Sequence, residues 1–429
     1  MNGELSRRSL LAGAGVLAGA ALGVGGRLWQ DRRRYGELPP HNGLVLLSGE
    51  ELSRGEQRRK LVGEWNSDEK HPHVTLIELE GSTDLRRSEI VAAAQMGGHR
   101  YDVVNVDVAW MAELIDRGYL AEFPSLDTRD FYGSALKTVS AGGKRYGVPF
   151  ASDAPLLYYD KRIASEPPRT FMDAVDLGRR LKKDLGEEEQ VYAYAGQFMD
   201  YEGLTVNAME IILSNGGDYL EFDGLAVEAL RHLVGCLRDR SVVGEEEKNS
   251  LRLFREGRAV FLRSWSYAFH QLVDVPPFKD DNERLGVVAL PWPGVLGGHN
   301  LAVTTTSALR REASDFIVEM TAPGSVQRTF GCGGYASPRP SSYSDPKCPG
   351  IDEGASVASE TEEERTPDLK EFAANVHLSL TRTETRPLTS WYPDYSLVLR
   401  RHLMRARAGD GEIDDRELRE EVRRIRGVP

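Results

Sequence analysis

Two hydrophobic patterns alternate along the chain after His41. Short apolar runs are typical of buried strands, and apolar residues spaced three and four apart are typical of helices that bury one face. The predicted strands are 44–47, 74–79, 101–106, 156–159, 191–194, 260–262, 285–290 and 301–305. The predicted helices are 61–65, 85–94, 108–116, 170–181, 202–214, 225–237, 251–255, 316–320, 395–408 and 414–426. Regular alternation of strands and helices predicts parallel sheets with right-handed crossovers.

Local signals mark the ends of several predicted helices. Thr170 followed by Asp173 resembles a capping box, and Gly216-Gly217 ends the helix before it. Pro323 is expected to stop the helix at 316–320. Residues 356–365 are acidic with few apolar positions, which predicts a surface loop.

The first 40 residues have the pattern of an export signal. Arg7-Arg8 precedes an apolar run from Leu10 to Gly26, and a basic start before such a run is typical of secretion. The arginine pair before Leu-Leu points to the twin-arginine route. Arg27 and residues 32–34 follow the run without a clear cleavage site, so the segment is either removed or kept as a membrane anchor. No cysteine ends the run, which argues against a lipid anchor there.

Composition limits the classes of function. A chain of 429 residues is long enough for two or more domains or lobes. Its 40% hydrophobic and 28% charged residues are typical of a soluble globular protein. The net charge of -12 argues against a broad nucleic-acid-binding surface, which would be basic.

The three cysteines have different surroundings. Cys332 and Cys348 are close enough in sequence to bridge a loop, and an envelope location would permit the disulfide. Such a bridge would stabilise the fold by roughly 3 kcal/mol through loop-closure entropy. Cys236 lies on the apolar face of the helix at 225–237, which predicts a buried thiol. The sequence leaves open whether the bridge forms.

Signatures of catalysis and of cofactors are missing from the sequence. We find no G-x-S-x-G elbow and no P-loop, and Gly13-Ala14-Gly15 has no strand before it. His71 and His73 do not have the spacing of a metal site. Asp107 and Asp153 could act as the acid and base of a glycosidase, but nothing else supports hydrolysis. We therefore expect a protein that is not an enzyme and uses no cofactor or metal.

Several segments share their residues and order with one family. They are 101–110, 146–159, 201–207, 257–265, 297–303 and 386–393. Together they resemble the extracellular solute-binding proteins of carbohydrate ABC importers, especially the trehalose- and maltose-binding branch. None of the segments is decisive by itself, but their common order extends over nearly the whole chain after Leu44.

This resemblance implies an α/β fold with two lobes, of the periplasmic-binding-protein type II, with a hinge and a ligand cleft between the lobes. Lobe 1 is expected to comprise 41–150 and 298–335, and lobe 2 to comprise 151–297 and 336–429, after the signal or anchor segment 1–40. The implied crossings are near 150–151, 293–298 and 333–338. These stretches are rich in glycine and proline, which suits a hinge.

The candidate ligand-binding residues are those that a sugar requires. Aromatic rings cover the apolar ring faces, while carboxylates and arginine bind the hydroxyl edges. Asp107 and Trp110 follow the strand at 101–106, at the edge where α/β sheets place ligands. Asp153 is the third candidate and lies on the first implied crossing. The alternative roles are a helix N-cap for Asp107, a core position for Trp110 and a turn residue for Asp153. Glu50 or Glu51 follows the first strand, and the pattern does not choose between them.

Four further candidates flank strands of the second lobe. Tyr201 and Glu202 open the helix at 202–214, where Glu202 has the alternative of being a first-turn helix charge. Trp265 and Tyr267 follow the strand at 260–262, and their alternative is a place in the core. The position of Trp265 in the segment that resembles the family favours a place in the ligand cleft.

The last two candidates are His299 and Arg386. His299 stands where the relatives often carry tryptophan, so it bears on which ligand is bound. Arg386 precedes Pro387, so its backbone is expected to be extended. The resemblance implies an arginine that binds hydroxyls, with a surface ion pair as the alternative.

The resulting hypothesis is an exported, monomeric binding protein of the cell envelope. It would capture a di- or oligosaccharide by hinge closure and deliver it to the permease subunits of an ABC importer, with no nucleic-acid partner. An envelope sensor or interaction protein with the same fold is the alternative.

Overall fold

The computed structural model describes residues 43–97, 99–184, 191–281, 283–348 and 369–428. Residues from Leu44 onward form one compact unit. The predicted signal or anchor segment and the predicted acidic loop at 356–365 lie outside the described residues. Within the described ranges, every helix is too short or too polar to cross a lipid bilayer.

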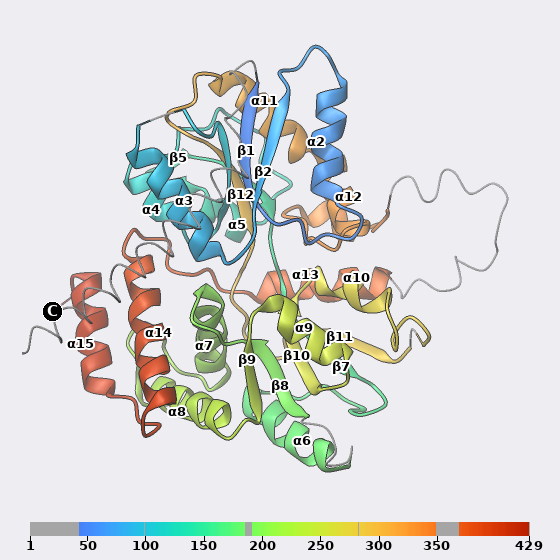
Figure 1. Ribbon diagram of the computed structural model, residues 1–429, viewed down its shortest axis with the longest axis vertical. Helices are drawn as coiled ribbons and strands as arrows, with labels where there is room; N and C mark the ends of the chain where they lie inside the picture. The colour runs from blue at the N-terminus through green and yellow to red at the C-terminus, as the bar shows by residue number, and fades with distance from the viewer. Residues whose placement is uncertain (1–42, 98, 185–190, 282, 349–368, 429) are drawn as a thin grey trace, which may run out of the picture. The chain divides into compact units, whose positions relative to one another are not determined.

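The first lobe is built around a five-stranded sheet in the order β2-β1-β3-β12-β6 (Figure 1). Its strands are β1 (Leu44–Gly49), β2 (Val74–Leu79), β3 (Val103–Asp107), β6 (Val148–Ala151) and β12 (His299–Val303). The other elements of this lobe are α2 (Gln57–Ser67), α3 (Thr83–Gln95), α4 (Met111–Asp116), α5 (Gly133–Thr138), the hairpin β4 (Ser140–Ala141) and β5 (Lys144–Arg145), α11 (Arg310–Met320) and α12 (Pro323–Gly331). Strand β1 is buried along its whole length, which explains why its first four residues are continuously apolar rather than alternating.

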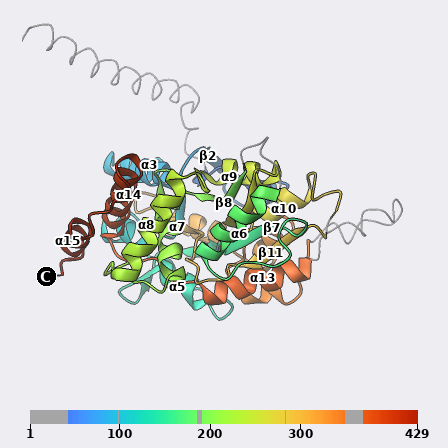
Figure 2. The same cartoon turned by 90° about the horizontal axis from the view of Figure 1, so that it is seen from below.

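The second lobe is built around a five-stranded sheet in the order β11-β7-β10-β8-β9. Its strands are β7 (Pro155–Asp160), β8 (Tyr192–Gln197), β9 (Val242–Glu245), β10 (Ala259–Trp265) and β11 (Leu285–Ala289). Its helices are α6 (Phe171–Asp184), α7 (Glu202–Ser214), α8 (Gly224–Arg238), α9 (Glu247–Arg255), α10 (Ala268–Val273), η1 (Pro340–Tyr343), α13 (Leu369–Arg382), α14 (Tyr392–Ala408) and α15 (Asp415–Arg426). Helices α9 and α13 (Figure 2) belong to one hydrophobic core on one face of this sheet, whereas Phe171 of α6 and Glu210 of α7 contact the other face, so both faces are covered.

The predicted parallel pairing is confirmed for β1 with β2 and β3 and for β8 with β9 and β10, but both sheets also contain antiparallel pairs. Strand β12 is antiparallel to β3 and β6, and β7 is antiparallel to β10 and β11. Both β12 and β7 enter their sheet directly from the opposite lobe. A strand that arrives in this way has no helical crossover to fix a parallel direction.

Three segments connect the lobes, at 152–154, 290–298 and 332–339. They are hydrogen-bonded to one another: the Ser152 amide donates to the Ala336 carbonyl (2.9 Å), and the Gly297 amide donates to the Asp153 carbonyl (3.0 Å). Gly298 has φ of +118°, and a Cβ there would lie 2.2 Å from the Ala151 carbonyl oxygen. Only glycine allows the second and first crossings to approach this closely.

Local sequence signals account for several boundaries. Pro323 follows the end of α11, as predicted, but it also opens α12 at the first helical turn, where its missing N–H is tolerated. The disulfide that the sequence left open forms between Cys332 and Cys348. Cys236 is a buried free thiol on α8, which confirms its prediction.

Candidate functional site

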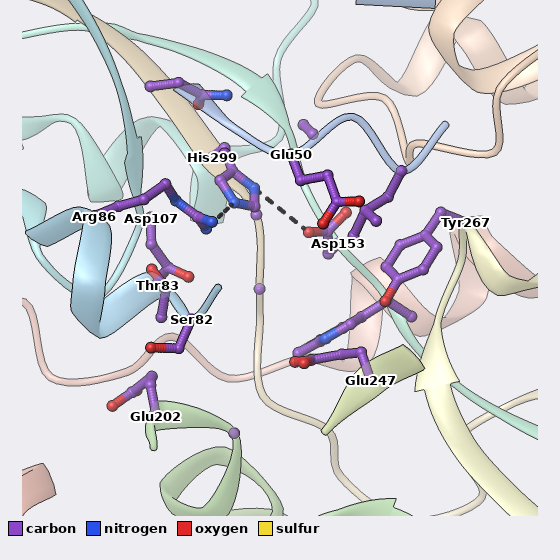
Figure 3. A pocket seen from close by; sticks show the side chains of 18 of the residues that line it. Glu50, Ser82, Thr83, Arg86, Asp107, Asp153, Glu202, Glu247, Tyr267 and His299 are labelled. Carbon is purple, nitrogen blue, oxygen red and sulfur yellow. Dashed lines mark hydrogen bonds and ion pairs between the residues drawn. The ribbon is translucent and has the colours of Figure 1, made fainter. Parts of the chain in front are cut away.

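A cavity of about 140 Å³ lies between the two lobes, where the crossing segments meet (Figure 3). The first lobe contributes the ends of β1 and β3 and the start of α3. The second lobe contributes the starts of α7 and α9 and the end of β10. Most of these positions are the carboxyl ends of parallel strands or the first turns of helices, where open α/β sheets place their ligands. The walls of the cavity therefore consist of side chains from both lobes.

The cavity brings together every predicted site residue except Trp110. These residues are Glu50, Asp107, Asp153, Tyr201, Glu202, Trp265, Tyr267, His299 and Arg386. Trp110 is 2% exposed and lies outside the cavity lining. Its indole N–H donates to the Thr83 hydroxyl (3.0 Å) and its ring packs against Tyr392. The expectation that Trp110 stacks on a ligand is corrected: it supports the wall behind Thr83.

Arg386 joins the two lobes through buried charges. One guanidinium nitrogen donates to Asp107 of β3 (2.9 Å) and another donates to Glu202 of α7 (2.8 Å). Glu202 also accepts from the hydroxyls of Tyr392 (2.5 Å) and Ser396 (2.7 Å). This network fixes the first turn of α7 against the end of β3.

The network controls the ionisation of its members. Burial disfavours the charge of Asp107, but Arg386 and the other nearby cations outweigh it, and the pKa of Asp107 is lowered. Burial dominates at Glu202, whose pKa is raised despite the contact with Arg386. The two carboxylates raise the pKa of Arg386 although its burial opposes the charge, so its guanidinium stays protonated.

His299 lies between a cation and a carboxylate (Figure 3). Its Nε2 is 3.2 Å from an Arg86 guanidinium nitrogen, and its Nδ1 is 3.7 Å from an Asp153 carboxylate oxygen. Burial, together with the positive charge of Arg86, lowers the pKa of His299 to about 3. The ring is neutral at pH 7, so Nε2 accepts from Arg86 and the proton resides on Nδ1, facing Asp153.

Asp153 has few partners of its own. It is 7% exposed, and its Oδ1 has no hydrogen-bond partner. Burial, with the negative charge of Asp107 adding to it, raises the pKa of Asp153 to about 7. A carboxylate buried in this way is unfavourable unless another group donates to it.

Aromatic side chains form the second-lobe wall of the cavity. The Arg263 guanidinium lies 3.7 Å from the centre of the Trp265 ring, and Arg263 itself is held by Glu210 (2.6 Å). The Tyr267 and Tyr335 rings meet edge to face, with centroids 6.4 Å apart. One face of Trp265 is therefore occupied by a fixed cation, and its position is set before any ligand binds.

Several lining residues were missed by the sequence analysis, notably Ser82, Thr83, Arg86 and Glu247. Ser82 caps α3, and both it and Thr83 follow the carboxyl end of β2. The rule that selected Asp107 could have selected them too. Arg86 and Glu247 gave no such signal, because each belongs to a stretch of charged residues that reads as a solvated helix face.

A group of possible metal ligands lies elsewhere, between α14 and α15. His402, Glu417 and Glu421 have ligand atoms close to one another. Arg401 pairs with Glu421, and Arg405 pairs with Glu417. These arginines already neutralise the carboxylates, so the group is better described as a contact between helices.

Comparisons with known proteins agree with this architecture. Residues 66–351 match the sequence pattern of the family described as bacterial extracellular solute-binding protein. A probable ABC transporter-binding protein of Deinococcus radiodurans is 25% identical over 278 residues, which cover 58% of this chain and 64% of that relative.

Solved structures share the fold. A maltose-bound MalE3 of T. maritima has a TM-score of 0.75 at 23% identity, covering 90% of this chain and 99% of that one. UgpB of Mycobacterium tuberculosis, in complex with glycerophosphocholine, has a TM-score of 0.73 at 18% identity, covering 90% of this chain and 98% of that one. Both likenesses bear out the two-lobed α/β fold.

Proposed function

The chain belongs to the bacterial extracellular solute-binding protein family, and from this membership we propose that it captures a sugar between its lobes and delivers it to an ABC importer. The observation that carries the proposal is the cavity itself. Its walls offer carboxylates, guanidinium groups and aromatic rings from both lobes at once. Hydroxyl edges and apolar ring faces of a sugar match these groups. The maltose-bound relative with the same fold supports this choice of ligand.

The size of the cavity favours a small ligand. In this arrangement of the lobes its volume is about 140 Å³. A protein cavity of about 150 Å³ holds one benzene molecule, so the space suits a single ring. The di- or oligosaccharide expected from the sequence would need the lobes to separate further.

Direct contacts between the lobes stabilise the closed arrangement. Asp84 of α3 accepts from the backbone amide of Glu202 (3.0 Å) and pairs with Arg400 of α14 (3.2 Å). Two further pairs span the lobes: Lys248 with Glu50 (2.5 Å) and Arg54 with Asp274 (2.7 Å). We infer that a ligand bridging both walls adds to these contacts and shifts the protein towards the closed form. An importer would recognise that form.

The location follows from the family, whose members are extracellular. We infer that the Arg7-Arg8 segment directs export by the twin-arginine route. The importer's permease subunits are the proposed partners.

A ligand panel tests the proposal. The full chain is heated with D-glucose, D-galactose, their 2-amino and N-acetyl forms, trehalose, maltose, amino acids and short peptides, and its melting temperature is recorded. A ligand at a hundred times its Kd stabilises the folded state by about 2.7 kcal/mol, so one sugar class should raise the melting temperature by several degrees. Stabilisation by amino acids or peptides alone, or by none of these compounds, would contradict a sugar-binding function.

Asp84→Ala should weaken ligand binding without touching the ligand. The variant removes two contacts between the lobes, so closure becomes less favourable by about 1–2 kcal/mol and affinity falls about fivefold to thirtyfold. Calorimetry with the sugar found in the panel measures the change. Asp127→Ala is the matched control, because Asp127 pairs with the exposed Arg129 within one lobe and its loss should leave affinity unchanged. Equal affinity in the two variants would exclude Asp84 from closure.

A further inference from the structure

The cavity lining carries more negative than positive charge. Its carboxylates are Glu50, Asp107, Asp153, Glu202 and Glu247, and its guanidinium groups are Arg58, Arg86 and Arg386. His299 adds no charge, since burial lowers its pKa to about 3. Five carboxylates thus face three guanidinium groups. A site for a neutral ligand does not need this imbalance.

Ion pairs neutralise most of the charged groups but leave two carboxylates, Asp153 and Glu247, and one guanidinium group, Arg86, whose side-chain partner is the neutral His299 ring. The pairs in and beside the cavity are Arg386 with Asp107 and Glu202, Lys248 with Glu50, and Arg58 with Glu51 and Glu78. Asp153 and Glu247 form no ion pair with any lysine or arginine in the described part of the chain. Asp153 also has an oxygen without a hydrogen-bond partner, although its side chain is only 10% exposed.

The two unpaired carboxylates lie on the same side of the cavity. Figure 3 shows Asp153 and Glu247 beside Tyr267, with Arg86 and Asp107 across from them. Glu247 is in the first turn of α9, where the helix dipole partly stabilises its charge, and Asp153 is on the crossing segment. A ligand that enters the cavity therefore meets negative charge on this side.

We propose that the ligand carries a protonated amine, which binds between Asp153 and Glu247, so that amino sugars are the preferred class. The proposal rests on the sugar-binding function proposed above and specifies its substrate. A neutral hydroxyl can donate a hydrogen bond to Asp153 but leaves the buried charge uncompensated. An ammonium group supplies both the donors and the charge, and such charge-assisted bonds are stronger than neutral ones.

The aromatic wall and the cavity size fit the same ligand. Trp265 already has the Arg263 guanidinium on one face, 3.7 Å from the ring centre, so its free face suits apolar C–H groups better than a second cation. The amine is then placed by the carboxylates, and the sugar ring by Trp265 and Tyr267. An amino monosaccharide matches a volume of about 140 Å³.

The proposal sets the direction of the pH dependence. The pKa of Asp153 in the free protein is raised to about 7, by burial first and then by Asp107. The charged or titratable groups around it are Glu50, Asp107, Glu247, Arg263, His299 and Arg386, together with Tyr267, Tyr335 and Tyr343. An ammonium ion favours ionised Asp153, so affinity should rise from pH 5 to pH 7, with proton release on binding at the lower pH, and fall again above about pH 8 as the amine of the ligand loses its proton.

Calorimetry on the full chain tests the proposal with two matched series: D-glucosamine, D-glucose and N-acetyl-D-glucosamine, and the same three forms of D-galactose. Within at least one series the amine should bind at least tenfold more tightly than the other two forms at pH 7, where the amine is mostly protonated. Asp153→Asn and Glu247→Gln keep the shape of the side chains and remove one charge each. Each should reduce amine affinity by about tenfold to a hundredfold and reduce affinity for the N-acetyl form much less.

The outcomes separate this proposal from the function on which it rests. Neutral sugars that bind as tightly as their amines, or an amine preference that survives in both variants, would overturn the amine site and leave sugar binding intact. No binding by any of the six compounds, by trehalose or by maltose would overturn sugar binding itself. If Asp153→Asn does not fold, Glu247→Gln decides alone, because Glu247 lies at the partly exposed start of α9.

Discussion

Replacing Arg386 with alanine is expected to lower the free energy of unfolding by about 3–5 kcal/mol, because one change leaves two buried carboxylates unpaired. Arg386 is 3% exposed and lies within 2.9 Å of Asp107 and 2.8 Å of Glu202. Removing its charge reverses the lowered pKa of Asp107 and adds to the raised pKa of Glu202. Urea unfolding measures the loss, and the proposed ligand should no longer bind, since α7 and β3 lose their common anchor.

The pH dependence of the stability loss in Arg386→Ala distinguishes the effect of unpaired charges from the effect of lost packing. In the folded variant Asp107 and Glu202 would have raised pKa values, so both would bind protons more readily than in the unfolded chain. The deficit in stability should therefore shrink as the pH falls towards 5. Arg129→Ala is the control, because Arg129 is 91% exposed and solvent screens its pair with Asp127. A deficit that is the same at pH 5 and pH 7.5 would mean that the charges are not responsible.

Many elements of the fold were predictable from their own hydrophobic pattern, but β6, β9, α12 and α13 were not predicted. The predicted bounds of β2 and α7, at 74–79 and 202–214, agree with those observed. What local patterns could not supply is the partner of each strand. Strands β12 and β7 pair antiparallel because they arrive from the other lobe, and their own residues carry no signal of that direction.

The site was predictable where a residue type and a strand end coincide. Asp107, Glu50 and Trp265 follow strands β3, β1 and β10 or end them, and all three line the cavity. Trp110 satisfied a similar pattern but points elsewhere, because residues 108–110 form a turn before α4 begins at Met111. The direction of a side chain in a turn is set by backbone angles, which hydrophobic spacing does not report.

Arg263 illustrates a further limit, since nothing in its strand sequence marks it as the centre of a buried network. It is fully buried in β10, donates to both oxygens of Glu210 at 2.6 and 2.8 Å, and supports the Trp265 ring. Its presence explains how an apolar strand can hold a cation: the carboxylate of Glu210 on α7 compensates the charge. Arg263 and Arg386 therefore use the same chemistry in different places, one inside the second lobe and one between the lobes.

The last prediction concerns Arg263→Met, which removes the buried cation inside the second lobe. The variant keeps an apolar side chain of similar length but leaves Glu210 buried and unpaired, so unfolding should require about 3–5 kcal/mol less free energy. Glu210→Gln added to Arg263→Met removes the uncompensated charge and retains an acceptor for the Val295 amide, 3.1 Å away. The double variant should thus regain at least about 1 kcal/mol over the single one. Urea unfolding of both variants measures this, with Arg252→Ala in the exposed pair with Glu256 as the control expected to change little. If the two substitutions destabilise additively, the buried charge of Glu210 is not the cause, and the loss must come from the packing of Arg263 against Trp265.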